Sequence, residues 1–243
     1  SRNDLQSLTI AEMLDVQAKL EAIPTDNFDF FTPAGGGRSL PHDIVTTAAQ
    51  SPVPFVIGTN RDENRLWAAL DPAQNQLGEE HWNDLCQQTF GEHALRAKNI
   101  YEQTRPEESP WQLISSIRTD TAFRQRAQRI SEQRVQANNK TWMYWFTWPT
   151  PVLDGIVGSC HGLDIPFAFD NLSLPRTDDL TGDGAERTEI AKRFADEIAQ
   201  FAKSSAPSWP AFDLADRSTL EINAEIAVLN DPEKEIREIY LSL

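Results

Sequence analysis

The residues Gly-Ser-Cys-His-Gly, 158–162, combine a thiol and an imidazole with small neighbours. One interpretation is a nucleophile elbow, a sharp turn that presents a nucleophile between two glycines, here Cys160. The other is a loop that presents His161 as a general base. The first interpretation predicts a complete cysteine hydrolase. The second predicts a hydrolase whose nucleophile lies elsewhere.

An elbow needs a strand that runs directly into the turn and a helix that starts directly after it. The predicted strand at 141–148 is followed by two prolines, and residues 150–158 separate it from Cys160. Pro166 follows the turn, and no capping residue stands at the right place. We therefore expect Cys160 to be a small buried thiol rather than a nucleophile.

No other nucleophile or metal site is marked by a motif. The pattern Gly-x-Ser-x-Gly does not occur in the 243 residues. The four histidines and two cysteines never stand at the spacing of zinc ligands, so neither a metal nor a cofactor is predicted.

Charge and hydropathy limit the kinds of partner that the protein could bind and the cellular compartment in which we expect it. The net charge is −15 and no basic cluster interrupts it, which argues against binding to nucleic acid. The first residues lack the charged-then-apolar pattern of a signal peptide, and no apolar run is long enough to span a membrane. We therefore expect no membrane partner and a cytoplasmic location, with secretion as the alternative.

A carboxylate and a histidine each follow a predicted strand. Glu63 comes after Val-Pro-Phe-Val-Ile-Gly, 53–58, and His161 comes after the aromatic run 141–148. Catalytic groups of open α/β sheets gather at the carboxyl ends of parallel strands, because the loops of neighbouring strands converge there. The two residues are 98 positions apart, in the order acid then histidine that follows the serine in α/β-hydrolases.

Strand and helix patterns alternate along the chain. The runs at 53–58 and 141–148 are almost continuously apolar, which is typical of strands buried on both faces. Long helical stretches separate them, so we expect a mainly parallel α/β sheet. The predicted helices are 9–22 (begun by a Thr9–Glu12 capping box and ended by Pro24), a mostly helical 64–139, and 185–203, and short strands and a terminal helix are expected at the end of the chain.

Asp120 stands in the segment Arg-Thr-Asp-Thr-Ala-Phe-Arg-Gln, 118–125, ahead of an amphipathic stretch. We predict that it is the N-cap of a helix that begins there, and that it has no catalytic role.

Four segments resemble, in order along the chain, the C-terminal half of type-B carboxylesterases, the cholinesterase-like family of the α/β-hydrolase superfamily. The resemblance covers essentially the whole chain, and the first and third segments are specific to the family. The segments are IGTNRDEN (57–64), RTDTAF (118–123), GSCHGLDIPFAFDN (158–171) and FAKSSAPSWPAFD (201–213).

The resemblance implies that residues 1–243 form the C-terminal portion of an α/β-hydrolase fold, a mainly parallel sheet flanked by helices. It implies hydrolysis of small-molecule carboxylic esters by a Ser-His-Glu triad, with Glu63 as the acid and His161 as the histidine. Two positions depart from the family pattern: Asn64 stands where the family usually has glycine, and Arg126 where it often has proline. Neither departure removes a catalytic group.

In the family, the serine and the oxyanion glycines lie in the N-terminal half. We therefore expect this chain to be inactive alone and incomplete without that half. A parallel sheet with an open apolar edge also predicts a partner segment, either the N-terminal part of the same protein or a second copy.

Two alternative functions are compatible with the sequence. A cholinesterase-like binding or adhesion module would have lost catalysis, and the residue at the serine position would identify it. A free-standing cysteine hydrolase would depend on Cys160. Six aromatic residues are candidate pocket walls, although core packing is expected for most of them: Phe30, Phe31, Trp111, Trp148, Phe167 and Phe169.

Overall fold

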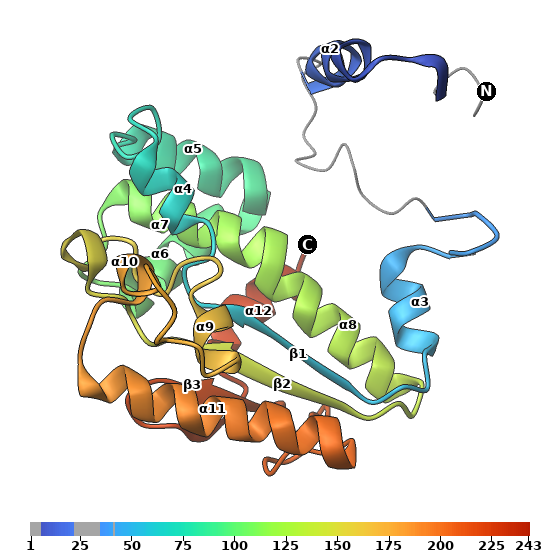
Figure 1. The fold of residues 1–243 in the computed structure, drawn as a ribbon. Helices are drawn as coiled ribbons and strands as arrows, with labels where there is room; N and C mark the ends of the chain where they lie inside the picture. Colours follow the sequence, from blue (N-terminus) through green and yellow to red (C-terminus); the bar gives the residue numbers. More distant parts are fainter. Residues whose placement is uncertain (1–5, 22–34, 41) are drawn as a thin grey trace. The chain divides into compact units, whose positions relative to one another are not determined.

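The structure is a computed structural model that describes residues 6–21, 35–40 and 42–243. The chain divides into two units, Ser1–Thr47 and Ala48–Leu243, which are described separately (Figure 1). The second unit contains the sheet and both residues of the predicted site.

The sheet has four strands in the order β1-β2-β3-β4. The first three are parallel to one another, whereas β4 pairs antiparallel with β3. The prediction of a mainly parallel α/β sheet is therefore confirmed. The strands are β1 (Phe55–Asn60), β2 (Thr141–Phe146), β3 (Ser218–Ile222) and β4 (Ala227–Asn230).

Burial differs between the two strands that lead to the site. In β2, all residues except Tyr144 are buried, as expected for a strand covered on both faces. In β1, only Thr59 and Asn60 are buried, so the same expectation is wrong for its first four residues. The reason is position in the sheet: β1 is an edge strand, and no strand in the described part of the chain pairs with its outer edge.

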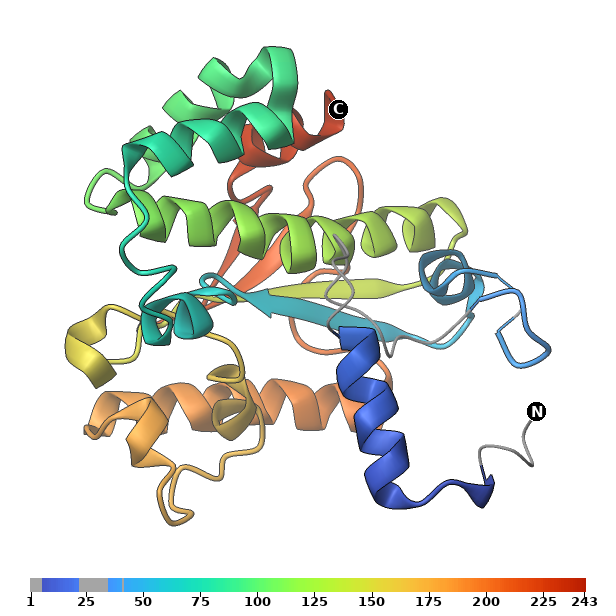
Figure 2. The ribbon, with the colours of Figure 1, turned by 90° about the horizontal axis from the view of Figure 1, so that it is seen from above.

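Helices cover both faces of the sheet. α8 (Gln125–Gln136) runs along one face and α11 (Ala185–Ser204) along the other (Figure 1 and Figure 2). α11 confirms the helix predicted at 185–203. The other helices of this unit are α4 (Arg65–Leu70), α5 (Glu79–Phe90), α6 (Ala94–Thr104), α7 (Pro110–Thr119), α9 (Asp164–Ala168), α10 (Asp178–Thr181) and α12 (Lys234–Leu241), with short 3-10 turns at Gly91–His93 and Val152–Gly155.

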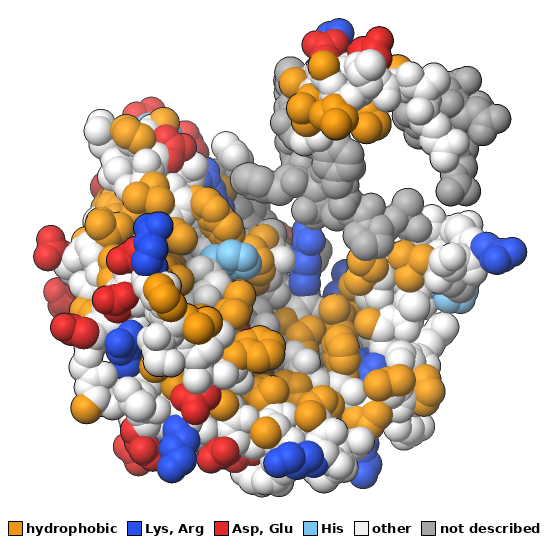
Figure 3. Space-filling view, viewed as in Figure 1, with side chains coloured by type: hydrophobic (Ala, Val, Ile, Leu, Met, Phe, Trp, Pro, Cys, Tyr) orange, Lys and Arg blue, Asp and Glu red, His pale blue; other side chains and the backbone are white. Residues whose placement is uncertain are grey.

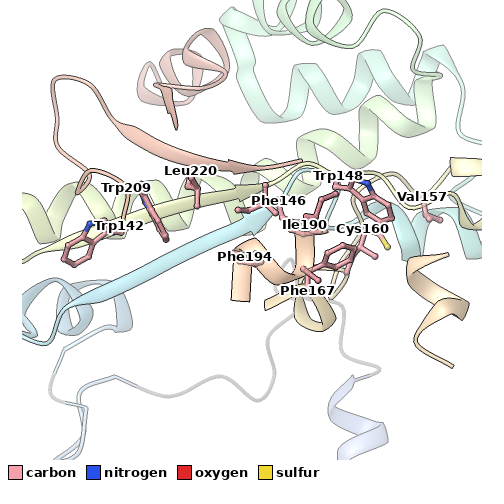
Figure 4. Close-up of a cluster of buried hydrophobic side chains, with 13 residues drawn as sticks. Trp142, Phe146, Trp148, Val157, Cys160, Phe167, Ile190, Phe194, Trp209 and Leu220 are labelled. Carbon is pink, nitrogen blue, oxygen red and sulfur yellow. The ribbon is translucent and has the colours of Figure 1, made fainter. Parts of the chain in front are cut away.

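The largest core cluster lies between β2, α9 and α11. The rings of Phe146, Phe167 and Phe194 are fully buried, and the Phe146 centroid lies 5.1 Å from Phe167 and 6.3 Å from Phe194 (Figure 4). Trp148 and Cys160 belong to the same cluster. The loops that follow β2 are therefore anchored in packed aromatic core, and a second cluster holds α5, α6, α7 and α12 together.

In the first unit, α2 (Ile10–Glu21) begins with the predicted capping box. The Thr9 backbone N–H donates to Glu12 Oε2 at 2.8 Å, and the Glu12 N–H donates to Thr9 Oγ1 at 3.3 Å. Pro24, Phe30 and Phe31 lie outside the described residues. α3 (Ile44–Gln50) leads into the second unit.

The predicted N-cap role of Asp120 is wrong. The helix already begins at Pro110, where Ser109 and Gln112 form a capping box. It continues through a π-helical turn at Asp120–Arg124 into α8, so Asp120 stands in the middle of a helical run. Its buried carboxylate accepts a hydrogen bond from the Tyr101 hydroxyl at 2.6 Å. Within the described residues it makes no hydrogen bond or ion pair with Glu63 or His161.

Burial, together with the charge of the nearby Glu233 carboxylate and against the opposing effect of Arg105, raises the pKa of Asp120 to about 7. The folded protein then keeps a proton that the unfolded chain loses near pH 4. Unfolding releases that proton, so the free energy of unfolding is expected to fall as the pH rises from about 4 to about 7. Asp120→Asn should flatten this fall in urea titrations between pH 4 and 8. An unchanged pH dependence would contradict the assignment.

Candidate active site

The site forms where two loops meet beyond the carboxyl ends of β1 and β2. Residues 147–158 make an excursion after β2, and the chain then returns beside the end of β1. There Asp62 and Cys160 form an isolated parallel bridge, and the Asp62 N–H donates to the Ser159 carbonyl at 2.9 Å. The two loops therefore continue the parallel pairing of the strands that carry them.

Glu63 and His161 are brought together by this arrangement. His161 Nδ1 lies 2.6 Å from Glu63 Oε2, which confirms that the ring is within hydrogen-bond reach of the carboxylate. Only 8% of the Glu63 side chain is exposed, compared with 48% for His161. Because a carboxylate can only accept, Nδ1 carries the proton and Nε2 of the neutral ring is left as the base, on an exposed side chain.

The second oxygen of Glu63 is also fixed. Oε1 accepts the backbone N–H of Asn60 at 2.8 Å. Burial raises the pKa of Glu63, while the hydrogen bonds from Asn60 and His161 lower it and the charge of Asp164 raises it. The carboxylate is thus held at both ends in a largely dry position.

Asp62, the neighbouring carboxylate that could replace Glu63 as the acid, is engaged in other contacts. Its carboxylate accepts the Ser159 N–H at 2.9 Å and pairs with Arg65 at 2.9 Å and Arg61 at 3.1 Å. A Cβ on Gly158 would lie 2.4 Å from Asp62 Oδ2, and Gly158 has a φ of +57°. Only glycine fits at this point of the loop that carries His161. Asp62 stabilises this loop through its hydrogen bond to Ser159.

Two aromatic side chains flank the imidazole, and neither is among the site residues predicted from the sequence. The centroid of Trp67 lies 4.8 Å from that of His161, and the centroid of Phe123 lies 5.6 Å away. Trp67 stands on α4, four residues after Glu63, and this short separation is the only sequence signal that could have placed it near the site. Phe123 contacts the ring from the π-helical turn, and no residue pattern in the sequence predicted that turn.

The aromatic candidates for pocket walls divide differently. Trp148 and Phe167 are core residues, as expected, whereas Trp111 is half-buried and Phe169 is 72% exposed. Phe30 and Phe31 cannot be placed because they lie outside the described residues.

Cys160 is fully buried, which confirms the expected buried thiol. Burial raises its pKa to about 11, so the sulfur is protonated at neutral pH. Among the described residues, no group of three or more His, Cys, Asp and Glu side chains is arranged to hold a metal ion. No helix in the described ranges is both long and apolar enough to cross a membrane.

Known proteins similar to this chain are esterases and related hydrolases. Para-nitrobenzyl esterase of Bacillus subtilis (strain 168) is 29% identical, over 96% of this chain and 48% of that protein. Phenmedipham hydrolase of Pseudarthrobacter oxydans is 27% identical, over 80% of this chain and 41% of that protein. The chain therefore spans about half the length, or less, of these relatives.

Solved structures agree with the sequence relatives. The crystal structure of Geobacillus stearothermophilus carboxylesterase EST55 at pH 6.2 matches 99% of this chain and 50% of its own, with a TM-score of 0.79 and 26% identity. The fold of this chain, a mixed sheet flanked by helices, is thus shared with carboxylesterases of the α/β-hydrolase fold. The carboxylesterase family model matches residues 3–238. Because that match covers nearly the whole sequence, this chain belongs to the carboxylesterase family.

Proposed function

We propose that this chain takes part in the hydrolysis of carboxylic esters and contributes His161 and Glu63 to a Ser-His-Glu triad. The observation that carries the proposal is the 2.6 Å contact between the exposed imidazole and the buried carboxylate. Relatives named as a para-nitrobenzyl esterase and a phenmedipham hydrolase support the reaction class.

In the proposed reaction, Nε2 of His161 removes the proton from the serine hydroxyl as the serine oxygen attacks the ester carbonyl carbon. The imidazolium then gives that proton to the leaving alcohol, and the acyl group stays on the serine. Water, activated by His161, releases the acid in the second half of the reaction. Glu63 keeps the proton on Nδ1 and stabilises the imidazolium.

We propose that the serine comes from a segment equivalent to the part of the relatives that this chain does not match. The absence of Gly-x-Ser-x-Gly from the 243 residues supports this, as does the greater length of the relatives. Without such a segment, His161 has only water to activate and no oxyanion hole to stabilise the intermediate. The chain is therefore expected to be inactive alone.

The surface near the catalytic pair supports a partner of this kind. The outer edge of β1 is unpaired by any strand of the described residues, and open edges are normally covered. Exposed apolar side chains also gather on this face of the molecule (Figure 3). Trp67, which lies beside the His161 ring, is exposed, as are Leu70, Ile165 and Phe169, which stand in or directly after the short helices α4 and α9 that follow Glu63 and His161. We expect a strand of the serine-bearing segment to pair with β1 and its apolar residues to cover these side chains.

Reconstitution tests the proposal. The purified chain should not hydrolyse para-nitrophenyl acetate, and it should gain this activity when it is co-expressed with the serine-bearing N-terminal half of a type-B carboxylesterase. A serine-directed organophosphate should abolish the activity, and Cys160→Ser should retain it.

Hydrolysis by the chain alone that survives the inhibitor would overturn the serine triad in favour of Cys160. An assembled protein that stays inactive although a serine is present would instead favour the non-catalytic binding module.

A further inference from the structure

Asn60 is the last residue of β1 and one of the least exposed polar residues of the second unit, with 1% of its surface accessible. It stands three positions before Glu63 and contacts both loops of the site. Its backbone N–H and its side-chain amide both donate to groups of the site rather than to a neighbouring strand.

The backbone of Asn60 holds the acid. The N–H of Arg61 donates to the Phe146 carbonyl of β2 at 2.9 Å, so the N–H of Asn60 faces the opposite edge of β1. Glu63 folds back over the strand end and accepts that N–H at 2.8 Å. The acid is thereby fixed relative to its own strand.

The side chain of Asn60 holds the histidine loop. Its amide nitrogen donates to the Cys160 carbonyl at 2.6 Å and to Asp164 Oδ1 at 3.3 Å. Both neighbours can only accept, so the nitrogen and not the oxygen must face them. One amide thus uses its two hydrogens on the residues one before and three after His161.

The remaining oxygen of this amide is left without compensation. Oδ1 of Asn60 is buried and has no hydrogen-bond donor within the part of the chain that the structure describes. A buried oxygen without a donor costs stability. An asparagine at this position therefore lowers stability, and its hydrogen bonds to the two loops of the site are the reason we assign to it.

We infer that Asn60 is a positioning residue that sets the geometry of the Glu63–His161 pair by binding both loops at once. The inference rests on the function proposed above. Asn60 makes no contact with the imidazole itself, so its effect passes through Glu63 and through the backbone at Cys160.

Asn60 also keeps a second carboxylate in place. Asp164 accepts the Tyr144 hydroxyl at 2.9 Å on Oδ2 and the Asn60 amide on Oδ1. The Tyr144 ring reaches Asp164 across β1 because residue 58 is glycine; a Cβ on Gly58 would lie 2.4 Å from the ring. With both oxygens engaged, Asp164 is not free to compete with Glu63 for His161.

The tautomer of His161 in the 243-residue chain tests this role without needing the serine. In ¹⁵N-histidine-labelled protein, the neutral ring of the wild type should carry its proton on Nδ1. Asn60→Ala should lose this preference, so that the Nε2-protonated form appears. Asn60→Asp keeps the shape of the side chain but removes both amide donors, so it should have the same effect. It serves as the second variant in case Asn60→Ala folds poorly.

Asn139→Ala is the matched control, because the Asn139 amide also donates to a distant backbone carbonyl, that of Ala49 at 2.7 Å, away from the site. It should lose stability without changing the His161 tautomer. In the reconstituted esterase, Asn60→Ala should lower kcat by about 10²-fold with little change in KM, as expected for a displaced catalytic group.

A wild-type tautomer and a wild-type kcat in both Asn60 variants would overturn the inference. Failure of the proposed function looks different: the wild-type chain would keep its Nδ1 proton and the Asn60 variants would lose it, while the reconstituted protein showed no esterase activity.

Discussion

His161→Ala is expected to lower the kcat of the reconstituted esterase by about 10⁶-fold, because the serine loses the base that takes its proton. Glu63→Gln should lower kcat by about 10⁴-fold. A glutamine amide can donate to the ring as well as accept from it, so it no longer enforces the proton on Nδ1. Steady-state hydrolysis of para-nitrophenyl acetate measures both effects, and KM should change little.

His81→Ala is the matched control. His81 is exposed on α5 and belongs to neither loop of the site, so the same change in side chain there should leave kcat unaltered. If His161→Ala stays within tenfold of His81→Ala, His161 is not the general base and the triad assignment is rejected.

The parts of the fold that were predicted correctly are those with a strong local pattern. The continuous apolar run of β2 and the apolar stripe of α11 each bury a surface that only one element type can bury efficiently. The meeting of Glu63 and His161 was predictable for a topological reason. Neighbouring parallel strands end at the same edge of a sheet, so residues just beyond their ends converge.

The parts that were missed depend on long-range packing. Asp120 follows a threonine and precedes an amphipathic stretch, which is an N-cap pattern, yet the helix had already begun at Ser109 and Pro110. A π-helical turn inserts a residue without any sequence signature, and this is how Phe123 comes to face His161. The half-burial of β1 likewise depends on which strand is its neighbour, and its own residues do not specify that.

Arg134→Met is expected to cause the largest loss of stability in the second unit. The buried guanidinium donates all five of its hydrogens, and within the described part of the chain it pairs with no carboxylate. Its loss leaves four carbonyls and one hydroxyl without their donor, at a cost of about 4 kcal/mol in the free energy of unfolding. For a chain of this size that corresponds to a fall in Tm of roughly 10 °C. The acceptors are Ala48 O (2.5 Å), Ser51 O (3.0 Å), Val53 O (2.6 Å), Lys140 O (3.2 Å) and Thr141 Oγ1 (2.7 Å).

Arg129→Met on the same helix is the control, because its side chain is exposed and the chemical change is identical. Equal urea midpoints for the two variants would show that the five bonds of Arg134 contribute nothing. Arg134→Lys should fall between them, since an ammonium has three donors and cannot span the same acceptors.

The position of Arg134 explains why this loss should reach the site only through folding. Arg134 joins the segment before β1 to the start of β2, where Phe55 pairs with Thr141, at the end of the strands opposite to Glu63 and His161. A shift of one residue there would turn every side chain of β1 to the other face. Because such a shift would disrupt the packing of β1, a variant that folds should have the native register. We expect the folded Arg134→Lys variant to keep the proton of His161 on Nδ1. Loss of the Nδ1 proton in a folded Arg134 variant would contradict this expectation, because Arg134 would then affect the site by a route other than folding.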